Sequence, residues 1–282
     1  MFRCTIPEGV EVKLSTEVVK PLVLGKRIIN IISGKTSRYK VKSPEGFDEF
    51  LKTLSPEVVR VMNVENYGKF MYWTFSNGWH MFCTFGMTGQ WSTKEGNHPC
   101  LEMYMGEDAR ESCESIYFND PRHFGTIKFT NKAKDLTDKL NDLGWDPLQM
   151  PLDKHAPWIK QQLSRTAKPI AEVLMDQKIF AGVGNYIRAE ALYQCKLSPF
   201  RGASSLKDDE VRQLCQAAVD VMEESYQHQG ATIQTYKTVY GEEGRYSSCF
   251  KVYGKKKDPL GNPIVKQDIG TRTIHWCPAI QV

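Results

Sequence analysis

Four short segments of the chain combine residue types that could bind or act on a phosphate-bearing ligand. In residues 180–188 (FAGVGNYIR), Gly182 and Gly184 precede Asn185, where a helix is expected to begin. Glycines let a backbone approach a ligand closely, and the free amides and dipole of a helix N-terminus attract anions. The segment therefore predicts a phosphate-binding turn, and a plain glycine-rich joint between two helices is the alternative.

Two further motifs place charged side chains at the ends of expected elements. Glu8 follows Pro7 in the first turn of a predicted helix, where the dipole stabilises a carboxylate. An ordinary helix start has the same composition. In residues 120–125 (DPRHFG), Arg122 stands beside aromatic residues and could wedge into a nucleic-acid duplex. The alternative is a structural pair between Arg122 and Asp120.

The fourth segment, residues 251–272, is basic. The whole chain has a net charge of +4, and this segment holds six cations against two carboxylates, which equals the entire excess. A local concentration of positive charge predicts a polyanionic partner, with a solvated basic hairpin as the alternative. The basic residues are Lys251, Lys255, Lys256, Lys257, Lys266 and Arg272.

Other kinds of chemical site have no counterpart in the sequence. The six histidines show no H-E-x-x-H spacing, and neither G-x-S-x-G nor a Walker loop occurs. The eight cysteines contain no C-x-x-C pair, so no metal site is predicted and the thiols are expected to be free. We therefore expect neither a metal nor a cofactor.

The predicted secondary structure around these segments changes along the chain, from strands to helices. The first part is expected to be β-rich after an opening helix over residues 8–24 that ends at Gly25. The dipeptide Asn77-Gly78 between two aromatic runs predicts a β-hairpin. Strand-like runs cover residues 26–33, 68–76, 79–85, 100–105 and 115–118.

From about residue 131 the pattern becomes helical. Residues 131–148 predict a polar helix, and residues 205–228 predict an amphipathic helix capped by Ser205. Near the end of the chain, a turn is expected at Gly261-Asn262 among three short strands. These strands are predicted over 248–254, 262–267 and 271–277.

Length and composition fit a globular protein. With 282 residues and 41% hydrophobic residues, the chain can form one large domain or two medium ones. No apolar run approaches 18 residues and the N-terminus lacks a secretory pattern, so neither a membrane helix nor a signal peptide is expected.

Taken together and in this order, these segments resemble the formamidopyrimidine-DNA glycosylase / endonuclease VIII family nearly from end to end. The matching segments are PEGVEV at 7–12, Gly68-Lys69, FGMTG at 85–89, DPRHFG at 120–125, MDQKIFAGVGNYIRAEAL at 175–192, VYGKKKDPLGNPIV at 252–265 and TRTIHWCPAIQ at 271–281. The resemblance implies an α+β fold: an N-terminal β-sandwich catalytic domain with an opening helix, a C-terminal helix-two-turn-helix domain, and a zincless-finger β-hairpin. The expected boundaries are 1–130 for the sandwich, 131–148 for a linker helix, 149–228 for the helical domain, and 229–282 for a lesion loop and the finger.

The resemblance also implies an activity and a site. Members of the family remove a damaged base and cut the DNA backbone, using the free amine of an N-terminal proline, here Pro7, to attack C1′ of the flipped nucleotide. Glu8 would donate a proton to the sugar oxygen, and Lys69 and Arg272 complete the implied catalytic set. The implied DNA-binding residues are Asn185, Arg122, Met87, Phe124, His98, Lys168, Tyr253 and Lys255. Among them, Met87, Arg122 and Phe124 would fill the gap left in the base stack.

The implied partner is damaged double-stranded DNA, or single-stranded or bubble DNA, held in a positive groove between the domains. No membrane partner is expected. We expect a monomer located in the nucleus or wherever the DNA lies, which is the cytoplasm for a bacterial or viral protein.

Two features depart from the family pattern. The zinc-binding finger of the family has two C-x-x-C pairs, whereas here only Cys277 remains and Leu260-Gly261-Asn262 replaces the first pair. This resembles the zincless, endonuclease VIII-like branch, whose hairpin would be held by strand pairing and packing. In the sequence as written, residues 1–6 precede Pro7, so its nitrogen is an amide. A start assigned too far upstream, cleavage after Ile6, or lost activity would explain this.

The base that is removed can be inferred only in part. The opening P-E-G-x-E and the zincless hairpin favour oxidised pyrimidines, while residues 230–254 resemble the loop that covers an oxidised purine. We therefore expect pyrimidines with some purine overlap, and a glycosylase specific for 8-oxoguanine or formamidopyrimidine is an alternative. A damage-binding protein without catalysis and a general nucleic-acid-binding domain are the remaining alternatives.

Overall fold

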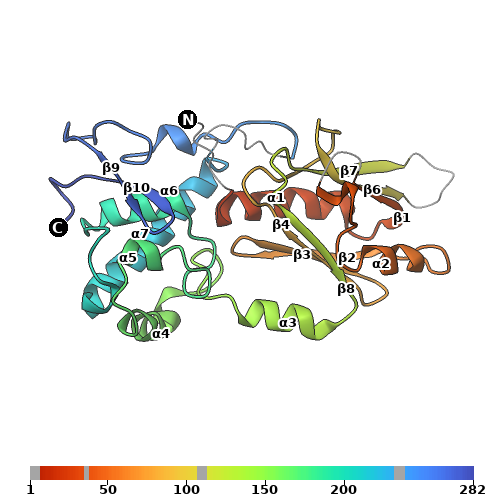
Figure 1. The fold of residues 1–282 in the computed structure, drawn as a ribbon, viewed down its shortest axis with the longest axis horizontal. Helices are drawn as coiled ribbons and strands as arrows, with labels where there is room; N and C mark the ends of the chain where they lie inside the picture. Colours follow the sequence, from red (N-terminus) through yellow and green to blue (C-terminus); the bar gives the residue numbers. More distant parts are fainter. Residues whose placement is uncertain (1–6, 35–37, 107–112, 232–238) are drawn as a thin grey trace. The chain divides into compact units, whose positions relative to one another are not determined.

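The computed structural model describes residues 7–34, 38–106, 113–231 and 239–282 (Figure 1). Contacts within the chain divide it into two compact units. The first unit comprises Met1–Pro7, Glu11–Asn141 and Ala231–Gly244, and the second comprises Glu8–Val10, Asp142–Gly230 and Arg245–Val282. The first is β-rich and the second mainly helical, as the sequence predicted.

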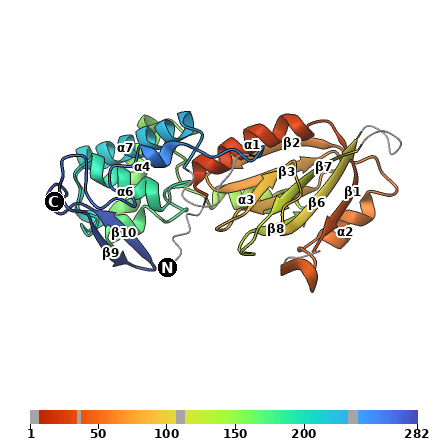
Figure 2. The same cartoon turned by 90° about the horizontal axis from the view of Figure 1, so that it is seen from above.

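The first unit is a sandwich of two antiparallel four-stranded sheets (Figure 2). One sheet has the order β1-β6-β7-β5 and the other β2-β3-β4-β8. The strands of the first are β1 (Arg27–Ser33), β6 (Pro99–Gly106), β7 (Glu114–Asn119) and β5 (Gln90–Ser92). Those of the second are β2 (Val61–Tyr67), β3 (Phe70–Phe75), β4 (His80–Thr84) and β8 (Thr126–Thr130). The α+β class and the sandwich are therefore confirmed.

Alternating side chains of both sheets form the core between them. On β3, Met71, Trp73 and Phe75 are buried while the intervening side chains are partly exposed, as expected of strands with one face in a core. Trp73 packs against Trp91 of the other sheet with ring centroids 5.0 Å apart. This aromatic packing joins the two sheets.

Two local predictions in the first unit are confirmed. Helix α1 (Gly9–Val23) ends before Gly25, which has the positive φ of 77° that glycine tolerates. The β3–β4 hairpin turns at Asn77-Gly78, where Gly78 has a φ of 79°. The unit also contains the 3-10 turn η1 (Arg38–Lys40), helix α2 (Phe47–Thr53) and helix α3 (Ala133–Asn141).

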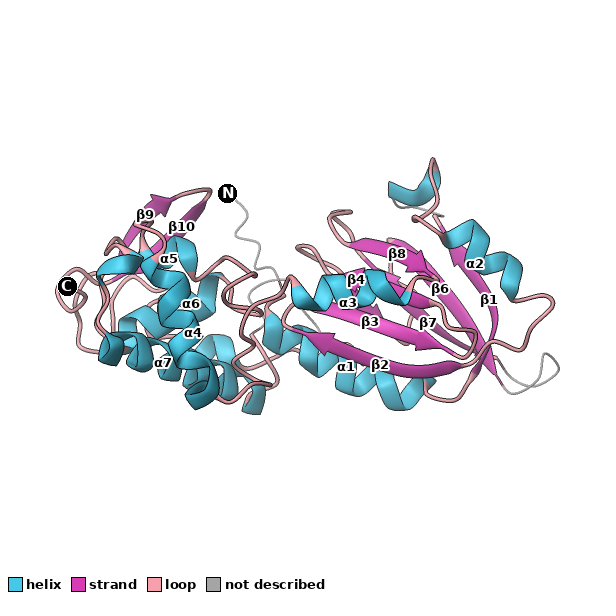
Figure 3. Cartoon of the chain, turned by 90° about the horizontal axis from the view of Figure 1, so that it is seen from below, coloured by secondary structure: helices cyan, strands magenta, loops and turns pink. Residues whose placement is uncertain are grey.

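The second unit is a bundle of helices with a β-hairpin, shown in Figure 3. Its helices are α4 (Leu152–Ser164), α5 (Ile170–Val173), α6 (Asn185–Gln194) and α7 (Asp208–Gln227), and its short 3-10 turns are η2 (Ala203–Ser205) and η3 (Tyr246–Ser248). Strands β9 (Val265–Ile269) and β10 (Arg272–Trp276) pair antiparallel, with Arg272 opposite Ile269. None of the described helices is long and apolar enough to cross a bilayer.

Two helix predictions were partly wrong. The helix expected over 131–148 ends at Asn141, because the backbone at Gly144 and Trp145 pairs instead with residues 177–181. A side chain at Gly144 would lie 2.4 Å from the backbone of Ile179. The expected cap of α7 is also different, since the Ser205 hydroxyl donates to the carbonyl of Gly202.

The strand expected over 248–254 does not form either. The amides of Lys251, Val252 and Tyr253 all donate to the carboxylate of Glu190 on α6, at 2.7–3.0 Å. Three consecutive amides that converge on one carboxylate cannot pair in a sheet ladder. The turn at Gly261 is present, with a φ of 87°, but the hairpin itself turns at Gly270, between β9 and β10.

Candidate active site and nucleic-acid interface

The carboxylate of Glu8 lies at the N-terminus of α6. It accepts hydrogen bonds from the amides of Tyr186, at 2.9 Å, and Ile187, at 3.3 Å. Only 1% of the Glu8 side-chain surface is exposed. From the sequence, these amides were expected to bind a phosphate. In the structure they donate hydrogen bonds to a carboxylate of the same chain, and in this way α6 fixes the position of Glu8.

The glycines of the 180–188 segment make room for this carboxylate. A methyl group at Gly184 would lie 2.3 Å from the carboxyl carbon of Glu8, far inside van der Waals contact. The amide of Gly9 donates to the carbonyl of Gly182 at 2.9 Å, and a side chain at Gly9 would meet the Gly182 backbone at 2.8 Å. Close approach of the backbone is needed here, as predicted, but the group approached is Glu8.

A buried guanidinium completes the charge arrangement around Glu8. Arg188, 1% exposed, donates to the side chain of Asn185 at 2.9 Å and to the carbonyl of Ala171 at 2.8 Å. Burial lowers the pKa of Arg188 to about 10 although the charge of Glu8 raises it, so the group stays cationic at neutral pH. Arg188 was not predicted as a site residue, although it lies one turn after Asn185 in the same segment.

Asn185 joins α6 to the C-terminal segment. Its side-chain amide donates to the carbonyl of Thr273 at 3.2 Å and to the hydroxyl of Tyr253 at 3.4 Å. Thr273 follows Arg272, whose side chain is exposed. The second unit thus brings Glu8, Asn185, Tyr253 and the strand of Arg272 together, although they are widely separated in sequence.

The other predicted basic contacts of the second unit lie at the surface. Lys255 is half-buried, and Lys168 is exposed and forms an ion pair with Glu172 at 2.8 Å. That pair raises the pKa of Lys168. Glu190, which holds residues 251–253, was also missed by the sequence analysis. Burial raises its pKa, and the three amide donors oppose this shift.

In the first unit, Met87, Arg122 and Phe124 lie on two loops fastened by Asp120. The fully buried Asp120 carboxylate accepts hydrogen bonds from the Thr88 hydroxyl at 2.5 Å, the Gly125 amide at 2.6 Å and the Arg122 amide at 3.3 Å. Its contact with Arg122 is thus through the backbone, not the ion pair considered from the sequence. Loops held this way can present rigid side chains.

The tip of the 120–125 loop is exposed, whereas Met87 on the other loop is half-buried. The guanidinium of Arg122 lies over the ring of Phe124 at 5.3 Å from its centroid, a cation–π contact, and Phe124 is 53% exposed. The ring of His98 lies edge-to-face with that of His123, 5.7 Å between centroids. An exposed aromatic ring braced by a cation is suited to inserting between bases.

The remaining predicted residues of the first unit are Pro7 and Lys69. Pro7 is buried directly before Glu8, and Lys69 lies in the turn between β2 and β3, where Gly68 has a φ of 53°. The lesion-loop segment predicted over 230–254 includes residues 232–238, which lie outside the described residues. At its start, the amide of Ala231 donates to the buried carboxylate of Glu11 at 2.8 Å.

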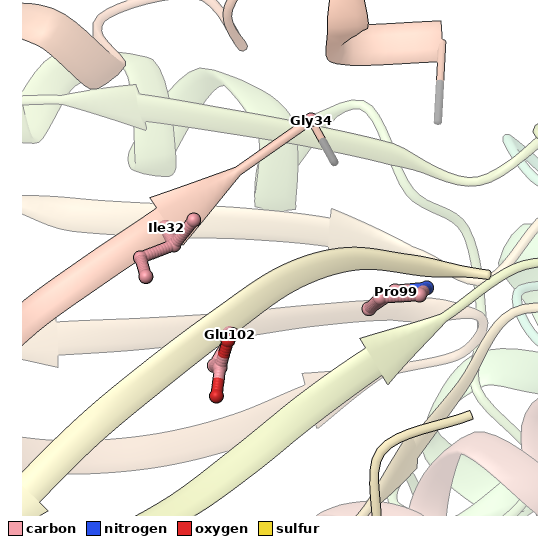
Figure 4. Close-up of a pocket in the computed structure, with 4 residues that line it drawn as sticks. All are labelled: Ile32, Gly34, Pro99 and Glu102. Carbon is pink, nitrogen blue, oxygen red and sulfur yellow. The ribbon is translucent and has the colours of Figure 1, made fainter. Parts of the chain in front are cut away.

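The first unit also contains a small hollow, one of whose lining residues directly follows the predicted residue His98. It is lined by Ile32 and Gly34 at the end of β1 and by Pro99 and Glu102 of β6 (Figure 4). A hydrogen bond to Glu102 raises the pKa of the Tyr104 phenol, and burial together with Glu102 raises that of Tyr117. None of the predicted site residues lines this hollow, and we assign it no chemistry.

Comparison with known proteins identifies the family. The N-terminal domain model of formamidopyrimidine-DNA glycosylases matches residues 6–127, and the H2TH domain model of the same glycosylases matches residues 143–237. The chain is 31% identical over 290 residues to the formamidopyrimidine-DNA glycosylase of Listeria monocytogenes, covering 98% of this chain and all of that protein. This chain belongs to the formamidopyrimidine-DNA glycosylase family. It is also 30% identical over 283 residues to the Thermus thermophilus enzyme of that name, covering 98% of each.

Solved structures of formamidopyrimidine-DNA glycosylases have the same fold. The MutM (Fpg) protein of Thermus thermophilus superposes with a TM-score of 0.82 at 28% identity, covering 98% of both chains. The Fpg of Lactococcus lactis, in a complex with DNA containing an abasic site, gives a TM-score of 0.83 at 21% identity over 98% of this chain and 99% of that one. The sandwich followed by the helical unit is therefore the fold of this glycosylase family.

Proposed function

We propose that this member of the family is a bifunctional DNA glycosylase and abasic-site lyase of base excision repair. It would excise oxidised bases, pyrimidines preferentially and some purines, and then cut the backbone. The observation that carries the proposal is the carboxylate of Glu8, which follows Pro7 directly and is held between two amides of α6. Few purely structural roles require a buried carboxylate beside a potential amine nucleophile.

The proposed nucleophile is the nitrogen of Pro7, once it is the chain terminus. In a peptide bond this nitrogen is an amide, so residues 1–6 must be absent from the active form. The N-terminal domain match begins at residue 6, one residue before Pro7. A free secondary amine at a chain terminus has a pKa of about 8, is partly neutral at pH 7 and can attack a carbon.

The proposed reaction proceeds through attack on the sugar, ring opening and elimination. The Pro7 nitrogen forms a bond to C1′, and the damaged base leaves with the electron pair of the glycosidic bond. As the sugar ring opens to an iminium ion, the amine loses its proton and the ring oxygen gains one. Glu8 would transfer that proton: its carboxylate first accepts the proton from the amine and then donates it to the ring oxygen. The two α6 amides keep Glu8 ionised beforehand, and so able to accept the proton. The iminium ion then acidifies C2′, and β- and δ-elimination release both phosphates.

The proposed DNA contacts divide into two classes. Lys69, Asn185 and Arg272, with His98, Lys168, Tyr253 and Lys255, would hold phosphates and fix the position of the flipped nucleotide. Met87, Arg122 and Phe124 would fill the gap that it leaves. The Asp120-fastened loops and the cation–π pair support the second class, because an inserting residue must resist displacement.

A second candidate is a glycosylase restricted to formamidopyrimidine and 8-oxoguanine. It is favoured by the names of the relatives and by a Lactococcus lactis Fpg variant solved with DNA containing Fapy-dG. The preference for pyrimidines rests instead on the opening P-E-G-x-E and the finger without cysteine pairs. Both candidates require the same amine and carboxylate.

Two forms of the chain, beginning at Met1 and at Pro7, test the proposal. Each is incubated with an abasic-site duplex and borohydride, and with duplexes that contain thymine glycol, 5-hydroxyuracil, 8-oxoguanine or formamidopyrimidine. We expect a covalent adduct and base release from the Pro7 form. Failure of both forms to be trapped would favour a damage-binding protein without catalysis. Release of purine lesions alone would favour the second candidate.

A further inference from the structure

The finger of this chain consists of the 258–262 turn, strands β9 and β10, and Cys277 after them. It does not contain a set of residues that fits a metal ion. A zinc-binding finger of this family would need two cysteine pairs, and here Cys277 alone remains. Among the residues that the structure describes, no three His, Cys, Asp or Glu side chains lie close enough together to hold a metal. The segments that a metal would join must therefore be joined in another way.

A single buried carboxylate lies where these segments meet. Asp258 is 5% exposed and accepts five hydrogen bonds from α6, from its own turn and from the residue after β10. The donors are the amides of Leu260 (3.0 Å) and Asn262 (2.7 Å) to Oδ1, and the Asn262 side chain (3.0 Å), the Tyr193 hydroxyl (3.1 Å) and the Cys277 thiol (3.6 Å) to Oδ2.

The pKa shifts of Asp258, Tyr193 and Cys277 fit a charged carboxylate that accepts hydrogen bonds from a neutral phenol and a neutral thiol. Burial alone would raise the pKa of Asp258, but the donors from Asn262, Tyr193 and Cys277 outweigh it and lower the pKa, so the carboxylate is charged. Burial and Asp258 raise the pKa of Tyr193 to about 12 and also raise that of Cys277. Cys277 is therefore a thiol that donates, and a metal ligand would have to be a thiolate.

A second anchor holds the same end of the finger. The side chain of Gln281, which is 2% exposed, accepts from the Cys277 amide at 2.7 Å and donates to the carbonyl of Leu197 at 3.0 Å. Both anchors connect the end of β10 to residues at and just beyond the C-terminal end of α6. The strand of Arg272 is thus fixed at its far end by buried polar contacts.

We propose that Asp258 is a positioning residue that takes the place of the metal, by tying the 258–262 turn and the end of β10 to α6. The finger then presents Arg272 in a fixed position without a bound ion. The link to Arg272 rests on the proposed function, whereas the link between the three segments does not. The strand pairing expected from the sequence is present between β9 and β10, and the contacts of Asp258 add a polar link between the hairpin and α6.

Asp258→Asn is the main test, because it keeps the shape and the acceptor for the two amides but turns Oδ2 into an amino group facing three donors. Hydrogen exchange of residues 258–264 and 277 is measured on the full chain without DNA. Affinity is measured for a duplex containing a tetrahydrofuran abasic-site analogue. Asp268→Asn is the matched control, because Asp268 is an exposed carboxylate of β9 that accepts a hydrogen bond within the hairpin, from the Thr273 hydroxyl at 2.6 Å, and, among the described residues, forms no hydrogen bond with α6.

We expect exchange at these amides to become at least tenfold faster and duplex affinity to fall about tenfold in Asp258→Asn, with little change in Asp268→Asn. Tyr193→Phe, which removes one donor, should give a smaller change in the same direction, and it serves as the test if Asp258→Asn does not fold. Equal behaviour of the Asp258 variant and its control would overturn the proposal. So would faster exchange of the unaltered protein after treatment with a zinc chelator.

The two proposals fail in different ways. If the finger loosens in Asp258→Asn but neither the Met1 nor the Pro7 form can be trapped on DNA, Asp258 still replaces a metal and the proposed enzymatic function is wrong. If trapping succeeds and exchange is unchanged, the enzyme stands and the role of Asp258 is wrong.

Discussion

Glu8 and Asp120 are both buried carboxylates that accept hydrogen bonds from two backbone amides, but their donors come from very different places in the chain. Those of Asp120 belong to Arg122 and Gly125, within five residues of it. Those of Glu8 belong to Tyr186 and Ile187, 178 and 179 residues away. The DPRHFG loop is thus fastened largely by its own sequence, whereas the carboxylate proposed for catalysis is positioned only when the second unit has folded around it.

Because of this difference, substitutions in the 120–125 loop and substitutions at the start of α6 should have different effects on Glu8. A change in the 120–125 loop should alter what the loop presents and leave Glu8 unaffected. A change at the start of α6 should displace Glu8 even where the substituted residue has no chemical role. The predictions below test this contrast.

The largest effect is expected from Glu8→Gln. Glutamine cannot carry the transferred proton, and its amino group would face one of the two α6 amides, so base excision should fall about 10²–10⁴-fold. Cleavage at a preformed abasic site should fall less, because the sugar is already open there. Single-turnover rates on both substrates measure this, with Glu17→Gln on the exposed face of α1 as control. Equal loss on both substrates would contradict the role given to Glu8.

Gly184→Ala tests whether α6 positions Glu8. The added methyl would lie 2.3 Å from the carboxyl carbon, so Glu8 must move, and a displacement of about 1 Å from a productive geometry costs roughly a hundredfold in rate. Gly202→Ala is the matched control, because its methyl would meet only the carbonyl of Ala167 at 3.4 Å. The excision rate of each variant is compared at equal folded fraction. An unimpaired Gly184→Ala would show that the α6 contact is dispensable.

Thr88→Val tests the Asp120 side of the comparison, through a donor on the neighbouring 85–89 loop. It removes the hydroxyl that donates to Asp120 at 2.5 Å with little change in volume, and should lower the free energy of unfolding by about 1–2 kcal/mol. Urea unfolding measures this, with Thr126→Val, which breaks an exposed hydroxyl pair with Thr84, as control. The rate at a preformed abasic site should remain near that of the unaltered protein. A rate loss as large as that of Gly184→Ala would abolish the distinction between the two carboxylates.

The smallest effect is expected at a single exposed cation outside both centres. Arg272→Ala should reduce the slope of log binding constant against log salt by about one unit, the contribution of one phosphate contact. Titration of a tetrahydrofuran-containing duplex at several salt concentrations measures the slope, with Lys52→Ala in α2 as control. An unchanged slope would remove Arg272 from the proposed phosphate contacts.

Sequence reasoning succeeded where a structure depends on neighbours in the chain. The Asn77-Gly78 hairpin and the end of α1 at Gly25 follow from backbone conformations that those residues favour. The predictions of secondary structure were wrong where groups from distant parts of the chain bind the backbone amides. Residues 251–253 carry a strand-like pattern, but Glu190 takes their amides, and α3 stops early because residues 144–145 pair with 177–181.

The family could be predicted from motifs in the sequence, and the order of sandwich and helical unit from periodicity and turn dipeptides, because all of these are local properties of the chain. Three features became visible only in the folded chain: the carboxylate at the N-terminus of α6, the burial of Arg188 beside Asn185, and the link from Asp258 to α6. Each of these depends on hydrogen bonds between residues that are brought together by packing, and spacing along a chain contains no information about which buried donor will meet which acceptor.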